Sequence, residues 1–165
     1  MKINKNLIAL IITAIGALLL GVQLQAEQAY MFFYRESQQL LFLDWSYISE
    51  VLLQFGGVGI FVSQFLVQFF IHPVVGAATT AVIVGVSVWM IWLTMRKIND
   101  NVALLPLLFV PSLFVVMYIA TSYHHYTGLV AIMFMAIALW GYSLCREQSY
   151  KVRVGIGAAI TLVLY

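Results

Sequence analysis

Long runs without a charged side chain are the feature that most constrains this chain. A helix that crosses the hydrocarbon layer of a membrane needs about 20 mostly apolar residues. Charged residues make up 8% of the chain, whereas a soluble domain is about 25% charged. This excludes a soluble globule, a disordered chain and a nucleic-acid-binding protein. The sequence predicts an all-α, polytopic transmembrane helix bundle of about five spans in one membrane domain, residues 1–165. The apolar runs are 7–25, 75–95, 103–120, 128–145 and a further run that begins at Val154.

Residues 51–71 form one more apolar run, which can follow one of two paths: it either crosses the membrane or stays on one side of it. The run has no charge and is long enough to cross, but it contains Gln54 and the pair Gly56-Gly57. The positive-inside rule decides between the two paths. If the run does not cross, only Arg35 lies apart from the other basic residues, which share one side: Lys2, Lys5, Arg96, Lys97, Arg146, Lys151 and Arg153. This solution predicts a multi-pass membrane protein with a cytoplasmic N-terminus.

Residues 26–74 then form an extracytoplasmic loop between an uncleaved first span at 7–25 and the remaining spans in 75–165. The loop carries four acids against one arginine, a net charge of −3. A structureless loop of this length is uncommon. We therefore expect two amphipathic helices at 37–54 and 59–71, joined by a Gly-Gly corner and lying in the plane of the membrane interface. The alternative is a lid that only packs against the spans.

The loop also holds the candidate site residues. A carboxylate near the membrane face can act as a general base on an acceptor hydroxyl, and the candidate catalytic residues are Glu36, Asp44 and Glu27. An arginine can hold a lipid phosphate, and polar residues recurring every four positions form one stripe on a helix. The candidate substrate-binding residues are accordingly Arg35, Gln64, Gln68 and His72. The alternative for Arg35 and Glu36 is a solvated salt bridge at the membrane rim. The carboxylate of Glu36 can alternatively ligate a divalent ion, but the sequence assigns no metal site, and it leaves the cofactor open.

Two segments carry a family resemblance. Residues 65–77 read Phe-Leu-Val-Gln-Phe-Phe-Ile-His-Pro-Val-Val-Gly-Ala, and residues 38–57 hold Asp44, Glu50 and the Gly-Gly pair. Both resemble the corresponding segments of an uncharacterised family of bacterial multi-pass membrane proteins. In that family a proline usually precedes the Gly-Gly pair, where this chain has Phe55. Members of the family are considerably longer, so we expect this chain to be an N-terminal fragment.

The architecture also resembles the N-terminal part of membrane glycosyltransferases of the GT-C type. Those enzymes begin with one span, followed by an outside loop with two interfacial helices. The resemblance implies a catalytic acid in the loop and a lipid-linked sugar as the donor. Their usual acidic motif directly after the first span is matched only weakly here, by Glu27-Gln28. A fold does not by itself imply a function.

Two hypotheses about function follow. The first is a GT-C-like transferase that uses a lipid-linked sugar at the outer face of a bacterial inner (cytoplasmic) membrane. Its further partners are membrane lipids. The second is a non-catalytic membrane scaffold, whose partner is another membrane protein. A transporter is the weakest alternative, because the complete spans hold no deeply placed ionisable side chain.

The topology predicts that the segment around Asn99 is cytoplasmic, because Arg96 and Lys97 precede it. A glycosylation or cysteine-accessibility tag at Asn99 should stay unmodified from outside intact cells. A tag at Asn99 that proves extracytoplasmic contradicts the orientation.

Overall fold

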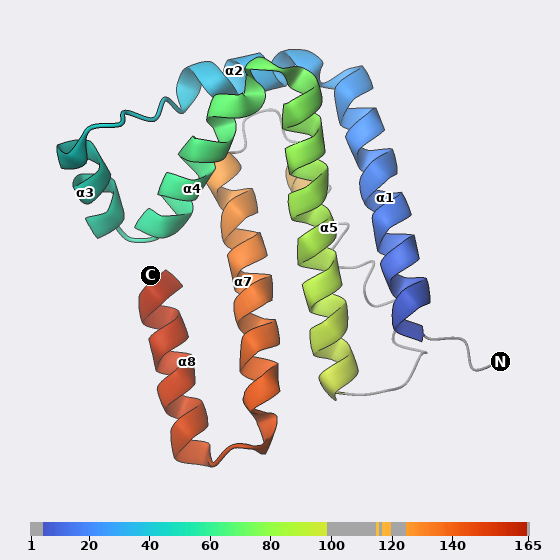
Figure 1. Ribbon diagram of the computed structural model, residues 1–165, viewed down its shortest axis with the longest axis vertical. Coiled ribbons are helices and arrows are strands. Elements are labelled where there is room, and N and C mark those ends of the chain that lie inside the picture. The colour runs from blue at the N-terminus through green and yellow to red at the C-terminus, as the bar shows by residue number, and fades with distance from the viewer. Residues whose placement is uncertain (1–4, 99–114, 116, 120–124, 165) are drawn as a thin grey trace.

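The computed structural model describes residues 5–98, 115, 117–119 and 125–164, and within these residues it holds helices and no strand (Figure 1). The predicted all-helical class is therefore confirmed for the described part. Residues 68–71 and 145–147 are short 3-10 helices. The elements are α1 Lys5–Glu27, α2 Ala29–Gln38, α3 Trp45–Leu53, α4 Gly57–Val67, η1 Gln68–Ile71, α5 Pro73–Ile98, α7 Tyr126–Leu144, η3 Cys145–Glu147 and α8 Tyr150–Leu164.

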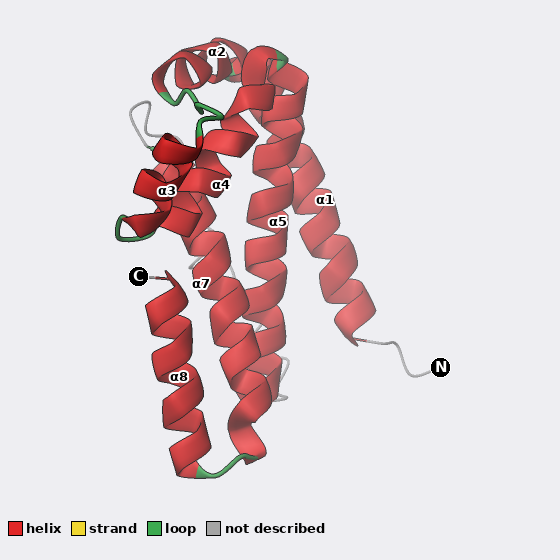
Figure 2. Ribbon diagram, turned by 60° about the vertical axis from the view of Figure 1, so that its left-hand side comes forward, coloured by secondary structure: helices red, strands yellow, loops and turns green. Residues whose placement is uncertain are grey.

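Within the described residues, three helices are long and apolar enough to cross a membrane, namely Asn6–Glu27, Pro73–Ile98 and Tyr126–Glu147. They correspond to α1, α5 and α7, and α5 packs against both of the others (Figures 1 and 2). Small residues line the contact between α1 and α5. A Cβ built on Gly21 would lie 3.2 Å from the Ala81 Cβ, and one on Gly85 would lie 3.1 Å from the Ala17 Cβ. Small side chains let two helix backbones approach closely.

The other two predicted spans have different outcomes. The run 103–120 falls outside the described residues except for 115 and 117–119. The run from Val154 belongs to α8, which spans Tyr150–Leu164 and packs on α7. With 15 residues, α8 is not one of the three helices of spanning length.

The helices α2, α3, α4 and η1 form a cap over one end of the long helices, which we call the capped end (Figure 2). Residues 51–71 contain no single spanning helix, because α3 ends at Leu53 and α4 begins at Gly57. Gly56 has φ 69°, in the left-handed region that glycine adopts without steric cost. The predicted Gly-Gly corner is therefore confirmed.

The expectation of one helix over 37–54 is wrong. The chain forms α2 up to Gln38, leaves the helical conformation over 39–44, and begins α3 at Trp45. The sequence mixes apolar and polar residues across the break without a glycine or proline to mark it. The break instead coincides with a tertiary contact, since the Gln68 Nε2 donates a hydrogen bond to the backbone oxygen of Gln39 at 3.1 Å.

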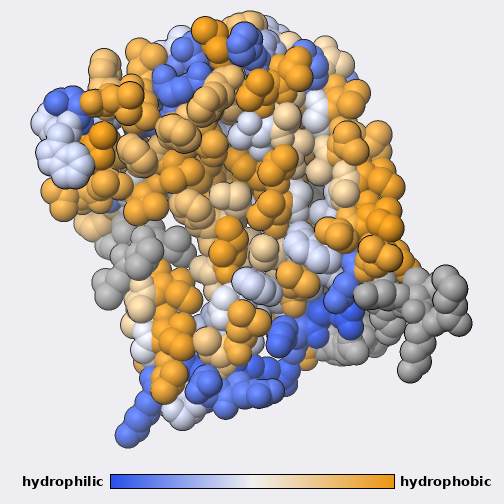
Figure 3. Space-filling view, viewed as in Figure 1, coloured by the Kyte–Doolittle hydropathy of each residue, from blue (hydrophilic) through white to orange (hydrophobic). Residues whose placement is uncertain are grey.

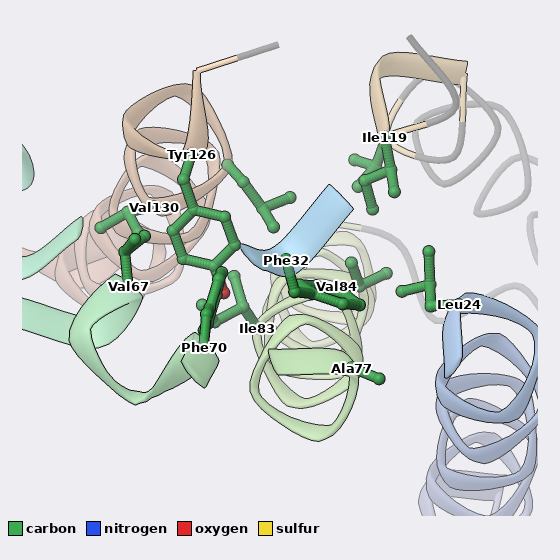
Figure 4. Close-up of a cluster of buried hydrophobic side chains, with 12 residues drawn as sticks. Leu24, Phe32, Val67, Phe70, Ala77, Ile83, Val84, Ile119, Tyr126 and Val130 are labelled. Carbon is green, nitrogen blue, oxygen red and sulfur yellow. The ribbon is translucent and has the colours of Figure 1, made fainter. Parts of the chain in front are cut away.

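Three aromatic rings join the cap to the long helices (Figure 4). Phe70 of η1 lies between Phe32 of α2 and Tyr126 of α7, with ring centroids 5.3 and 4.8 Å away and interplanar angles of 87° and 88°. All three side chains have an exposed fraction of 0%. Such edge-to-face pairs each stabilise a fold by about 0.5–1.5 kcal/mol beyond their buried area. The Tyr126 hydroxyl also lies 3.4 Å from the Thr80 hydroxyl of α5.

Basic side chains gather at the opposite end, which we call the basic end (Figure 3). Arg96 donates a hydrogen bond to the Asn6 side chain, which joins the end of α5 to the start of α1. Arg146 donates to the backbone oxygen of Lys97 at 2.7 Å, which joins η3 to α5. The structure thus brings together basic residues that lie far apart in the sequence, as the charge pattern predicts.

Replacement of Gly76 by alanine tests the contact between α2 and α5. A Cβ at Gly76 would lie 2.6 Å from the Phe32 Cδ1, and the ring cannot swing away because it packs against Phe70. We expect Gly76→Ala to destabilise the protein by about 1–3 kcal/mol through overpacking. Gly16→Ala is the control, because nothing lies within 4 Å of its added Cβ; it should be neutral or stabilise by up to about 1 kcal/mol. Thermal unfolding in detergent measures both, and equal midpoints contradict the contact.

Candidate functional site

A cavity of about 600 Å³ lies within the cap. The end of α2 and the segment after it form one wall, α3 and α4 form another, and the start of α7 closes the third. The polar residues among its lining are Ser37, Gln38, Gln39, Tyr47, Gln64, His125 and Thr127. Within the described residues, no charged side chain lines it. The cavity therefore offers hydrogen bonds and aromatic surface to a ligand.

Hydrogen bonds between the elements fix the polar walls. The Gln64 Nε2 donates to the Tyr47 hydroxyl at 2.9 Å, which ties α4 to α3. The Gln68 Nε2 donates to the Gln39 backbone oxygen at 3.1 Å, which ties α4 and η1 to the segment after α2. The side-chain oxygens of Gln39 and Gln64 are buried and accept no hydrogen bond within the described part of the chain. Both are acceptors for a ligand hydroxyl or amine, since an amide oxygen has two lone pairs.

A pair of hydroxyls joins α4 to α7 beside this cavity. Ser63 has an exposed fraction of 0%, and its Oγ lies 2.8 Å from the Thr127 Oγ1. Ser63 also donates to the backbone oxygen of Ile60 at 2.8 Å. Because a hydroxyl has one hydrogen, Thr127 is the donor between the two side chains. This pair spans 64 positions of sequence.

The predicted polar stripe is divided by the structure. Gln64 lines the cavity, and Gln68 hydrogen-bonds to the cavity residue Gln39. His72 is exposed and has an extended backbone after η1. The cause is η1 itself, because a 3-10 helix has 3.0 residues per turn and shifts the angular position of each residue after it.

None of the three candidate acids lines the cavity. Glu36 is half-buried on α2 and directly precedes the lining residue Ser37. Asp44 is exposed, precedes α3 and accepts a hydrogen bond from the Ser46 hydroxyl. Glu27 is exposed at the end of α1, where it accepts a hydrogen bond from Gln23 at 3.4 Å. Glu36 and Asp44 thus flank the cavity along the chain, and Glu27 lies on a helix that does not line it.

Arg35 is buried inside the cap, with an exposed fraction of 5%. It therefore does not form a solvated salt bridge at the rim. Its guanidinium carbon lies 5.6 Å from the centroid of the Phe32 ring, a cation–π contact. Burial lowers the pKa of the Arg35 guanidinium from its usual value, because desolvation disfavours the charged form. Arginine nevertheless stays protonated in proteins, so this end holds a permanent positive charge.

The sequence analysis missed several cavity residues, among them Tyr47, Thr127 and Gln39. Tyr47 and Gln64 belong to different helices, and no local spacing relates them. A useful signal is present in retrospect, since Ser63, Gln64 and Gln68 all lie on α4 and η1 in a segment without any charge. Polar side chains in such a segment need partners once buried.

The described residues contain no group of three or more His, Cys, Asp or Glu side chains that could hold a metal ion. His125 lines the cavity without a second residue of these types.

Comparison with known proteins gives a family. Residues 3–165 match the model of a family of unknown function, DUF6057. The chain belongs to this family. This confirms the expectation of an uncharacterised family. No curated protein and no solved structure matches the DUF6057 chain, so its likeness to GT-C transferases stays a prediction.

A double-mutant cycle tests the hydroxyl pair that closes the cavity. We expect Ser63→Ala and Thr127→Val to couple by about 0.5–1.5 kcal/mol in unfolding free energy, because each leaves the other hydroxyl without its partner. Thr94→Val is the control, since its hydroxyl bonds only within its own helix, to Met90 at 2.8 Å. Additive effects of Ser63→Ala and Thr127→Val contradict the pairing.

Proposed function

We propose that this DUF6057 chain is an integral membrane protein in which α1, α5 and α7 cross a bacterial inner membrane. The basic end faces the cytoplasm, in line with the positive-inside rule, and the capped end faces outward. Three helices of spanning length support this. So does the gathering of Arg96 and Arg146 at one end, away from the cap. In this orientation the cavity opens at the outer membrane face.

We further propose that the cavity holds the polar head of a lipid-linked sugar, in a transferase of the GT-C kind. The supporting observation is the chemistry of the walls. Tyr47 and Phe42 offer aromatic faces, and the free amide oxygens of Gln39 and Gln64 offer acceptors. The neutral, hydroxyl-rich sugar of such a donor matches this lining, because its hydroxyls satisfy buried polar groups without placing a charge among them.

In the proposed sugar transfer, Glu36 or Asp44 and Arg35 have different roles. A carboxylate of Glu36 or Asp44 takes the proton of an acceptor hydroxyl. The acceptor oxygen then bonds to the anomeric carbon, and the bond from that carbon to the lipid phosphate oxygen breaks. The leaving phosphate carries the negative charge, and the buried cation of Arg35 makes the potential at this end more favourable for it. Gln68 positions the segment at Gln39 through its hydrogen bond.

A second candidate is a non-catalytic membrane scaffold. It is favoured by two observations: among the described residues no acid lines the cavity, and α8 exposes the small residues Gly155, Ala158 and Ala159. Small residues on a helix face permit close packing against another membrane helix. The scaffold predicts stable co-purification with a second membrane protein and tolerance of every acid substitution.

Acid substitutions in the full-length protein separate the two functions. Glu36→Gln and Asp44→Asn remove the proton acceptor while preserving size, so the transferase predicts a loss of about 10²–10⁴-fold in sugar transfer for whichever residue is the base. Release of radiolabelled sugar from a lipid-linked donor measures it. Glu50→Gln is the control, because Glu50 is exposed on α3, away from the lining segment 37–42 that Glu36 and Asp44 border. Full transfer by Glu36→Gln, Asp44→Asn and Glu27→Gln alike rules out the transferase.

A further inference from the structure

The helices α3 and α4 form a hairpin whose tip is the turn at residues 54–56. The two helices pack against each other, and α4 also contacts α7 and α8. In Figures 1 and 2 both arms run from the capped end along the upper part of α7, and the turn lies towards the middle of that helix. The contact with α8 is informative, since α8 starts from the basic end. The tip of the hairpin therefore points away from the capped end, towards the basic end.

The outer surface of this tip is apolar. Leu53 has an exposed fraction of 87% and Phe55 of 76%, and Leu52 and Val58 are exposed as well. The turn contains one polar side chain, Gln54, and the sequence has no charged residue from 51 to 95. A hairpin tip that faces water is usually built from small and polar residues.

The polar side chains of α4 point inward, whereas Ser46 and Glu50 are exposed on α3, so the apolar outer surface belongs to α4 and to the tip. Ser63 bonds to Thr127 of α7, and Gln64 bonds to Tyr47 on the opposite arm. An amphipathic helix at a water interface has the reverse arrangement, with its polar face turned outward. Val58 and Phe65 of α4 and Phe69 of η1 are exposed. Figure 3 shows apolar surface over α4 and over α1, with more hydrophilic residues at the edge formed by α3.

The backbone of the turn is largely closed on itself. Gln54 donates to the Val51 oxygen at 3.2 Å, and Gly57 donates to the Gln54 oxygen at 2.9 Å. A Cβ built on Gly57 would clash with the backbone oxygens of Val51 and Leu52, so the arms meet as closely as glycine allows. Backbone that enters hydrocarbon needs internal hydrogen bonds, because lipid tails offer none.

We propose that α3 and α4 form a re-entrant hairpin, which enters the hydrocarbon layer from the outer face and returns to the same face. Its tip, at Leu53 and Phe55, contacts lipid acyl chains. This differs from two helices lying flat in the interface plane. The inference rests on the proposed crossing of the membrane by α1, α5 and α7, and it is independent of any sugar transfer.

Spin labelling of the whole protein tests the surroundings of the tip. Cys145 is the one cysteine of the sequence, so Cys145→Ala provides the background. Nitroxides are attached at Phe55→Cys, at Leu18→Cys on the exposed face of α1, and at Ser37→Cys on α2. The protein is reconstituted into vesicles of phosphatidylethanolamine and phosphatidylglycerol. Collisions with oxygen, which dissolves in hydrocarbon, and with a water-soluble nickel chelate are then compared.

The expected result is that the Phe55→Cys label behaves like the Leu18→Cys label, with frequent oxygen collisions and loss of nickel collisions. Nickel collisions equal to those at Ser37→Cys place the tip in water and overturn the proposal. Protection from both reagents overturns it too, because a second copy or another protein then covers the tip. Nickel collisions at Leu18→Cys itself refute the membrane crossing of α1, which is a separate failure.

Thiol labelling in intact cells tests whether both arms return to one face. Trp45→Cys at the start of α3 and Ile71→Cys at the end of η1 occupy exposed positions. Both should react with a membrane-impermeant maleimide from outside, whereas Ser149→Cys, exposed near the basic end, should react only after permeabilisation. If Ile71→Cys, like Ser149→Cys, reacts only after permeabilisation, the segment crosses the membrane and is not re-entrant.

Discussion

The edge-to-face contacts of Phe70 with Phe32 and Tyr126 hold the cap in place on the long helices. They join α2, η1 and α7 in one buried contact, and the Tyr126 hydroxyl approaches Thr80 of α5. Buried apolar side chains of the cap and of the long helices pack around these rings, among them Val67 of α4 and Val130 of α7. The cavity exists because this contact sets the position of α2 and η1 relative to α7.

The cavity is a neutral site beside a buried charge. Its walls are amides, hydroxyls and aromatic rings, whereas the acids Glu36 and Asp44 flank it and Arg35 lies within the cap. An exposed fraction of only 5% is unusual for arginine, since arginine side chains are mostly exposed. The contact with the Phe32 ring supplies part of the stabilisation that the guanidinium loses on desolvation. Within the described residues, the charged side chains thus lie beside the cavity and not in its walls.

Local pattern predicted some of this site and missed the rest for identifiable reasons. The Gly-Gly corner and the pairing of Gln64 and Gln68 on one face follow from glycine geometry and helical spacing, and both are present. The stripe failed at His72, because a 3-10 turn intervenes and its onset has no sequence marker. The expectation of a single helix over 37–54 was wrong because the chain leaves the helical conformation at Gln39, whose backbone oxygen accepts a hydrogen bond from the Gln68 side chain of η1. Ser63 and Thr127 meet across the fold, where no spacing rule applies.

The sequence by itself determined the helical class, the apolar lengths of α1, α5 and α7, and the gathering of basic residues at one end. Each of these follows from local composition, because apolar run length and charge position act along the chain. Tertiary structure alone decided that Arg35 is buried, that α3 and α4 fold back as a hairpin with an apolar tip, and that neutral groups from four elements line an open cavity. These features depend on which surfaces meet at long sequence separation. Such contacts are selected by the packing of whole helices, which no single segment encodes.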